Sequence, residues 1–251
     1  MTIDAGTGDG RSVLAAAARE PGALVIGLDA DAPSMAEASR RAARPPRKGG
    51  AANALFVVAA AERIPAELRG LAATVTVRFP WASLLRGCLG REPAVAAGLA
   101  EMLAPGGELV LLLAPAERDR LAGLPVEPSA IAAAARSAFE PLGLELIEGR
   151  PASDAEVRAS GSTWAKRLLG RNGSAAGSTP IAASTPIAGA TALAAALPGA
   201  EVRSAATGAF RRVVLVRFRC PGGRDDAGAN GPVDPRRWGR PDGGPAGPSG
   251  R

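Results

Sequence analysis

Hydrophobic and polar positions follow two different periods along the first half of the chain. Short apolar runs, typical of buried strands, lie at 23–28, 54–58, 75–79 and 108–113. Between these runs, apolar residues recur at helical spacing over 11–19, 33–43 and 93–103. Strands that alternate with helices predict a parallel, doubly wound α/β sheet. Its ligand crevice is then expected at the carboxyl ends of the strands.

The second half of the chain changes character twice. We expect helices over 129–142, 153–158 and 163–169, a strand over 144–147 and a final strand over 212–219. Residues 172–209 are rich in Ala, Gly, Ser and Thr and repeat a short segment in tandem, which indicates a low-complexity insertion. Residues 221–251 are dominated by Gly and Pro, as is typical of disorder. The sequence therefore predicts one folded domain over 1–220, followed by a disordered tail.

Composition excludes several kinds of catalysis. The 251 residues include no His, which rules out Ser-His-Asp and Cys-His mechanisms and His-ligated zinc. Cys88 and Cys220 are too far apart for a Cys-x-x-Cys site, so we expect free thiols, no metal and a cytoplasmic location. The chain has no apolar run of membrane-spanning length, and Met1 to Asp4 do not start like a signal peptide. We therefore expect no contact with a membrane.

A glycine-rich loop, Asp4-Ala5-Gly6-Thr7-Gly8-Asp9-Gly10, lies between a strand start and a helix. Alternate glycines allow a tight turn and a close approach to a ligand. Asp29 ends the next strand, at about the separation at which an acid meets ribose hydroxyls. The glycines are spaced G-x-G-x-G rather than in the dinucleotide pattern G-x-G-x-x-G, which favours S-adenosylmethionine over a dinucleotide. An ordinary glycine-rich turn is the alternative interpretation, and the presence of Asp29 favours cofactor binding.

Small residues follow the third strand at 59–61 and leave space for a flat adenine ring. Glu62, the next residue, can accept a hydrogen bond from an amine. A plain loop is the alternative interpretation, but the position of this segment in the series of strands favours a cofactor contact.

Two tryptophans stand in segments that suit substrate binding. Trp81 follows the fourth strand in Phe79-Pro80-Trp81, and Trp164 follows Ser162-Thr163. A single Trp is often a core residue, whereas a Trp in a loop beside an active site can stack on a base, worth roughly 1–3 kcal/mol.

Positive charge gathers near these segments in a chain of net charge +6. A solubilising surface is one interpretation of the two basic groups, and contact with RNA phosphates is the other. The candidate RNA-binding residues are Arg44, Arg47, Lys48, Lys166, Arg167 and Arg171.

The motifs over about residues 3–170, taken in order, resemble the aminoglycoside-resistance 16S rRNA adenine-N1 methyltransferases of the kanamycin–apramycin resistance type. The Pro-Trp and Ser/Thr-Trp segments are the specific part of this resemblance. It implies a class I S-adenosylmethionine-dependent methyltransferase, a Rossmann-like sheet that is mostly parallel with an antiparallel final strand.

The resemblance also implies a partner and a site. The enzyme would act as a monomer on the decoding-site adenine of 16S rRNA in the small ribosomal subunit. Trp81 and Trp164 would stack on the flipped target base. The cofactor site would be lined by Asp4, Gly6, Thr7, Gly8, Asp29, Ala60, Ala61, Glu62, Ser83 and Ser162.

Methylation of adenine N1 is compatible with a chain that has no His. N1 carries a lone pair and no proton, so the reaction needs no general base. Three alternatives stay open: a tRNA guanine-N7 methyltransferase, a small-molecule methyltransferase and an rRNA-binding homologue without activity. The guanine-N7 enzymes have an Asp-Pro insert that Phe79-Pro80-Trp81 lacks, and the basic loops argue against a small-molecule substrate.

Overall fold

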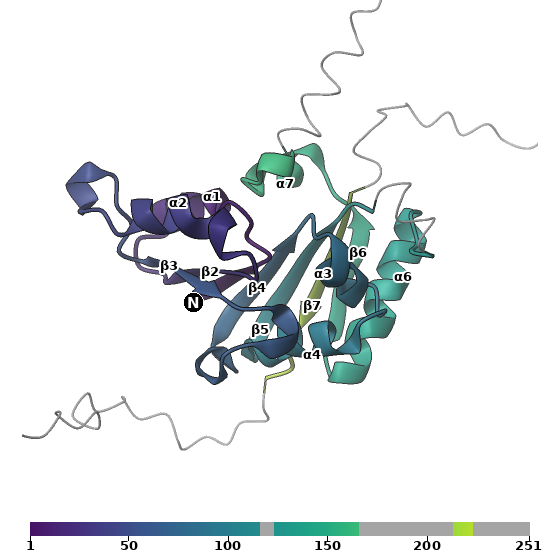
Figure 1. Cartoon of the computed structure of the whole chain (residues 1–251). Helices are drawn as coiled ribbons and strands as arrows, with labels where there is room; N and C mark the ends of the chain where they lie inside the picture. The colour runs from purple at the N-terminus through teal and green to yellow at the C-terminus, as the bar shows by residue number, and fades with distance from the viewer. Residues whose placement is uncertain (116–122, 166–212, 223–251) are drawn as a thin grey trace, which may run out of the picture.

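The computed structural model describes residues 1–115, 123–165 and 213–222 (Figure 1). The predicted insertion at 172–209 and nearly all of the predicted tail at 221–251 lie outside the described residues. The helix expected over 163–169 is described only as far as Ala165.

Seven strands form a single sheet in the order β3-β2-β1-β4-β5-β7-β6 (Figure 1). The pairs among β1 to β5 are parallel, and β7 is antiparallel to both of its neighbours. This arrangement confirms the predicted doubly wound, mostly parallel sheet with an antiparallel final strand. The strands are β1 (Thr2–Ala5), β2 (Val25–Asp29), β3 (Ala54–Val58), β4 (Ala72–Arg78), β5 (Leu103–Leu113), β6 (Glu145–Pro151) and β7 (Val214–Arg219).

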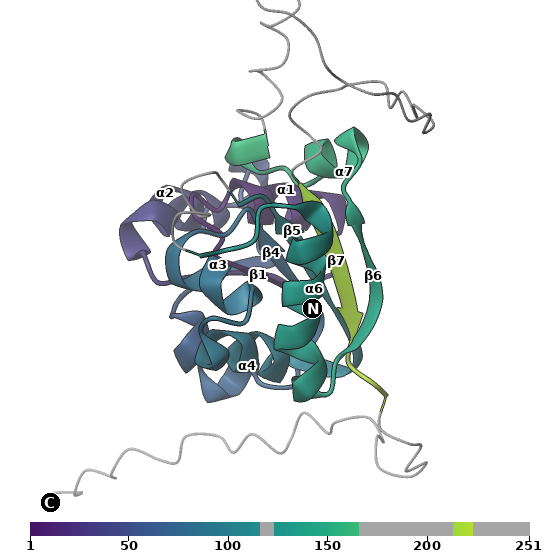
Figure 2. The ribbon, with the colours of Figure 1, turned by 90° about the vertical axis from the view of Figure 1, so that its right-hand side faces the viewer.

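Helices cover both faces of the sheet (Figures 1 and 2). α1 and α2 pack over β2 and β3, whereas α3, α4 and α6 cover the opposite face. None of the helices in the described ranges has both the length and the apolar character that crossing a membrane requires. The helices are α1 (Arg11–Arg19), α2 (Ala32–Ala42), α3 (Ala82–Cys88), α4 (Pro93–Glu101), α6 (Pro128–Phe139) and α7 (Asp154–Ala159), with 3-10 turns η1 (Pro46–Lys48), η2 (Ala61–Arg63), η3 (Ala66–Leu68) and η4 (Glu140–Leu142).

Several predicted boundaries are wrong for identifiable reasons. The helix expected over 93–103 ends at Glu101, because Leu103 already pairs with Ala72 of β4. The helix expected over 129–142 changes to a 3-10 turn after Phe139. The pattern predicted no helix directly after Trp81, but this segment forms α3, whose Leu85 and Cys88 are buried one turn apart. Tertiary contacts therefore determine where these helices begin and end, and they override local helix propensity.

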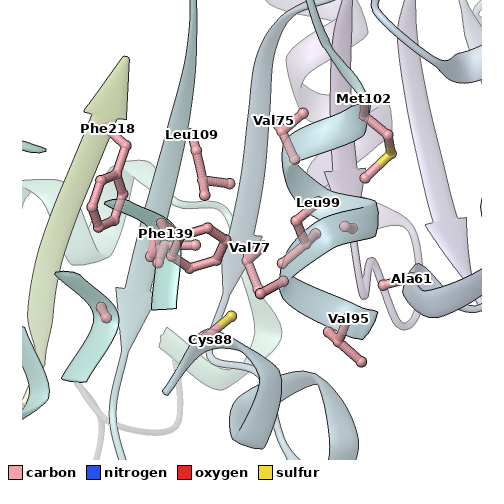
Figure 3. Packing of buried hydrophobic residues seen from close by; sticks show 14 of the residues in the cluster. Ala61, Val75, Val77, Cys88, Val95, Leu99, Met102, Leu109, Phe139 and Phe218 are labelled. Carbon is pink, nitrogen blue, oxygen red and sulfur yellow. The ribbon is translucent and has the colours of Figure 1, made fainter. Parts of the chain in front are cut away.

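The main core lies between the sheet and the face formed by α3, α4 and α6 (Figure 3). It is largely aliphatic, and its one close aromatic pair among the described residues is Phe139 with Phe218, whose ring centroids lie 5.2 Å apart. Cys88 is fully buried there, and burial raises the pKa of its thiol to about 12. The thiol therefore stays protonated at neutral pH and is a structural residue, not a nucleophile.

A chain of ion pairs fastens α7 to the antiparallel end of the sheet. Arg150 of β6 holds Glu156 of α7 with two hydrogen bonds of 2.9 and 2.6 Å, and it also contacts Glu148 at 2.9 Å. Arg217 of β7 then bridges Glu148 at 3.0 Å and Glu108 at 2.6 Å. The Arg150 guanidinium is the main cause that lowers the pKa of Glu156 to about 2, and Arg217 lowers the pKa values of Glu108 and Glu148.

This network predicts an acid-sensitive contribution to stability. A carboxylate with a depressed pKa stabilises the fold fully above its unfolded pKa, and the effect is lost as the pH falls through the folded pKa. The free energy of unfolding should therefore fall between about pH 5 and about pH 2. Urea denaturation across this range should show a shallower decline for Glu156→Gln than for the parent protein. An equal decline in both would show that Glu156 does not contribute.

Candidate functional site

The predicted glycine-rich loop connects β1 to α1 with three left-handed residues. Gly6, Gly8 and Gly10 have φ values of 72°, 58° and 67°, which side chains rarely tolerate. A Cβ on Gly6 would overlap only the flexible end of the Leu84 side chain, so the left-handed φ is the main reason for glycine at this position.

Asp4 lies beneath this loop and is almost completely buried. Its Oδ2 accepts hydrogen bonds from the hydroxyls of Thr7 at 3.1 Å and Ser12 at 2.6 Å. Its Oδ1 accepts from the hydroxyl of Thr76 at 2.9 Å and forms an ion pair with Nη1 of Arg78 at 2.7 Å. Asp4 therefore joins the loop to α1 and β4 from below, and a direct cofactor contact for it stays a prediction.

Asp29 supports the same loop from the end of β2. Its Oδ2 accepts a hydrogen bond from the backbone N–H of Gly8 at 2.8 Å, and its Oδ1 accepts from that of Asp31 at 2.9 Å. A carboxylate has about four acceptor sites, so both oxygens can still accept from a ligand hydroxyl.

A cavity of about 440 Å³ opens beside Asp29, within the usual size of a ligand pocket. Most of the residues that line it lie at or shortly after the carboxyl ends of β1, β2, β3 and β4, where the predicted crevice lies. Its walls are formed by Gly6, Leu28, Asp29, Ala30, Asp31, Ala59, Ala60, Ala61, Glu62, Pro80, Trp81, Ala82, Ser83, Leu84 and Val95.

Seven of the predicted cofactor and stacking residues meet at this cavity: Gly6, Asp29, Ala60, Ala61, Glu62, Trp81 and Ser83. Five predicted residues do not line it: Asp4, Thr7, Gly8, Ser162 and Trp164. Sequence analysis missed Asp31 and Leu84, although Asp31 stands two residues after Asp29. It also missed Val95, which comes from α4 and carries no local signal of a ligand site.

Gly98 allows α4 to approach the cavity wall. A Cβ at this position would overlap the backbone carbonyl oxygen of Ala61 in η2. We expect Gly98→Ala to force α4 away from η2, to cost about 1–3 kcal/mol of folding free energy and to weaken ligand binding at the cavity. Urea denaturation and calorimetric titration test this, with Gly22→Ala, whose Cβ would meet nothing within 4 Å and whose φ is not left-handed, as the control. An unaltered affinity in Gly98→Ala would contradict the role of this contact.

Trp81 stands at the rim of the cavity with 73% of its surface exposed. The residues on either side of the Pro-Trp pair, Phe79 and Ala82, have φ values of 51° and 50°, which are rare for residues with side chains. Strained backbone of this kind concentrates at functional sites. The structure therefore presents a large aromatic ring to solvent at some cost in local backbone energy.

Trp164 lies on a separate segment that is tied to the glycine-rich loop. The Thr163 hydroxyl donates to Oδ2 of Asp9 at 2.7 Å, and the Trp164 backbone N–H donates to the Ser162 hydroxyl oxygen at 3.2 Å. Trp164 is 45% exposed. Ser162 thus orders the segment around Trp164.

Three predicted RNA-binding residues are exposed on the connection between α2 and β3. Arg47 and Lys48 belong to η1, and Arg44 lies two residues before it, with its guanidinium 4.0 Å from Glu37. The other three, Lys166, Arg167 and Arg171, lie outside the described residues.

The order of strands and the cavity at their ends agree with a match to a family model. Residues 1–178 match the NpmA family, described as 16S rRNA (adenine(1408)-N(1))-methyltransferase. This chain belongs to that family. A family member from Streptoalloteichus tenebrarius is 36% identical over 173 residues, which cover 67% of this chain and 80% of that protein.

Solved structures agree with the family assignment. The antibiotic-resistance methyltransferase Kmr is 42% identical with a TM-score of 0.54, over 60% of this chain and 79% of that one. A 16S rRNA (adenine(1408)-N(1))-methyltransferase from Catenulisporales acidiphilia, crystallised with the cosubstrate SAM, is 29% identical with a TM-score of 0.64. That match covers 89% of this chain and 87% of the other. The NpmA family and its class I methyltransferase fold are thus those that the motifs indicated.

Proposed function

We propose that this protein transfers a methyl group from S-adenosylmethionine to N1 of adenine 1408 in 16S rRNA of the small ribosomal subunit, and so confers aminoglycoside resistance. Family membership supports this proposal. The observation that carries it is the cavity itself, which joins a carboxylate suited to ribose, Asp29, with an exposed aromatic ring suited to a base, Trp81.

The cavity residues fit the cofactor in chemistry and in size. Asp29 would accept hydrogen bonds from the ribose hydroxyls, and the small residues Ala60 and Ala61 would leave room for the adenine ring. Glu62 and Ser83 would supply polar contacts, and Gly6 would let the backbone approach closely. When bound, S-adenosylmethionine supplies a methyl group on a positively charged sulfur.

The protein's contribution to the reaction would be positional. Adenine N1 holds a lone pair and no proton, so no side chain needs to act as a base. Trp81 would stack on the flipped adenine at the cavity rim, with Trp164 as the second stacking partner. Holding the base in line with the methyl group can supply about 7–11 kcal/mol in favourable cases.

The basic residues around η1 would contact rRNA phosphates. Replacing Arg47 and Lys48 together with alanine should weaken binding to small subunits at low salt, because two phosphate contacts are lost. The slope of log affinity against log salt should fall by about 2. Filter binding across a salt series measures this slope. The control is Arg19→Ala, an exposed arginine at the far end of α1, which should leave the slope unchanged.

Methyl transfer from radiolabelled S-adenosylmethionine to purified small subunits tests the proposed function. Incorporation into 16S rRNA, together with calorimetric binding of the cofactor, is the expected result. Cofactor binding without incorporation would instead indicate an rRNA-binding homologue without activity. Incorporation into tRNA would point to a different substrate.

A further inference from the structure

Arg78 connects two parts of the proposed site, the glycine-rich loop and the segment that carries Trp81. It is the last residue of β4 and directly precedes the segment that carries Trp81. Its guanidinium forms the 2.7 Å ion pair with Asp4 beneath the glycine-rich loop. Within the described residues, Asp4 is the one carboxylate within ion-pair distance of Arg78.

The ion pair is well shielded from solvent. The Asp4 side chain is 4% exposed and that of Arg78 is 18% exposed. Removing one partner of such a shielded ion pair strongly destabilises the fold, because the other charge is left buried without an opposite charge. Asp4 also holds Thr7 and Ser12, so any displacement of its carboxylate reaches the loop and the start of α1 directly.

The segment after Arg78 has little freedom to absorb a displacement. Phe79 is fixed by its left-handed φ, by burial and by a hydrogen bond from its backbone N–H to the carbonyl oxygen of Leu112 at 2.8 Å. A shift at Arg78, the end of β4, therefore passes to Trp81, three residues further on.

We propose that Arg78 is a positioning residue. Through its ion pair with Asp4, it fixes the position of the glycine-rich cofactor loop relative to the Trp81 segment. The proposal rests on the proposed function, because it assigns the loop to the cofactor and Trp81 to the target base. Arg78 touches neither ligand in this account, and its effect passes through Asp4 and the β4 end.

A second cavity allows a sharp chemical test. It has a volume of about 310 Å³ and is lined by Arg78 and Thr76, over an apolar floor that includes Val110, Leu112 and Leu215. The Arg78 side chain forms part of the wall of this cavity. Truncation to alanine would leave a space, continuous with solvent, into which a free guanidinium ion can diffuse and pair with Asp4.

The experiment compares Arg78→Ala with Arg217→Ala. Both arginines line the second cavity, but Arg217 pairs with Glu108 and Glu148 and not with Asp4. Arg78→Ala should lower kcat for small-subunit methylation about 10- to 100-fold and weaken cofactor binding, as expected for a misplacement of reacting groups. Millimolar guanidinium chloride should restore part of both losses, whereas the same concentration of sodium chloride should not, because sodium carries no N–H group that can pair with the Asp4 carboxylate. Neither salt should change the activity of Arg217→Ala.

Either of two results with Arg78→Ala would overturn the inference. The first is a folded Arg78→Ala protein with wild-type kcat and cofactor affinity. The second is an equal response of both variants to guanidinium. If Arg78→Ala does not fold, Arg78→Lys keeps the charge but changes the geometry, and it should still lower kcat; wild-type kcat in that variant would refute the role. A wild-type protein that neither binds the cofactor nor methylates the subunit overturns the proposed function and this inference together.

Discussion

Trp81→Ala should lower kcat/KM for methylation of the small subunit by roughly 5- to 150-fold, with little change in cofactor affinity. This range corresponds to the loss of about 1–3 kcal/mol of stacking on the target base. Because 73% of the Trp81 surface is exposed, its removal leaves no cavity in the core, and the free energy of unfolding should change little.

The measurement needs rate constants, calorimetric cofactor binding and urea denaturation on the same preparation. Trp81→Phe is the matched variant, since it keeps an aromatic face and should retain much of the activity. Wild-type methylation by Trp81→Ala would remove the stacking role. A parallel loss of cofactor affinity would place Trp81 in the cofactor site instead.

Asp4→Asn should be the most destabilising conservative change near the site. It removes the charge that compensates Arg78 in a buried setting, and breaking such a pair costs about 3–5 kcal/mol. Proteins are stable by only about 5–15 kcal/mol, so this loss is large. The hydroxyls of Thr7, Ser12 and Thr76 would also have to rearrange around an amide.

Asp29→Asn is the matched control, because it alters an acid that supports the same loop but is half-buried and accepts from backbone N–H groups. We expect it to cost about 1 kcal/mol of stability, while its cofactor affinity falls. Urea denaturation of both variants gives the comparison. A cost for Asp4→Asn no greater than that for Asp29→Asn would contradict the structural role of Asp4.

The sequence predicted the parts of the fold and the site that depend on local pattern. The glycine-rich loop, Asp29 and the Pro-Trp segment are local motifs, and each lies where a parallel sheet brings the carboxyl ends of its strands together. α1 and β3 also have the predicted bounds, because their apolar periods end at clear breaks.

Other features depend on contacts between distant segments, which a local pattern cannot reveal. Val95 reaches the cavity because Gly98 lets α4 lie against η2, and neither residue is unusual in its own segment. The partners of Asp4, Thr76 and Arg78, come from a strand more than 70 residues later, so the buried contacts of Asp4 could not be inferred from the glycine-rich motif. The bond between Thr163 and Asp9 spans 154 residues, so the docking of the Trp164 segment on the loop was equally hidden.

Mapping the modified nucleotide is the most direct test of the proposed methylation. Small subunits incubated with the protein and S-adenosylmethionine would be analysed by reverse transcription, which stops at adenine methylated on N1. The proposed methylation predicts one new stop, at adenine 1408, that requires the cofactor and is strongly reduced with Trp81→Ala. No stop at that adenine, or a stop at another nucleotide, would contradict it.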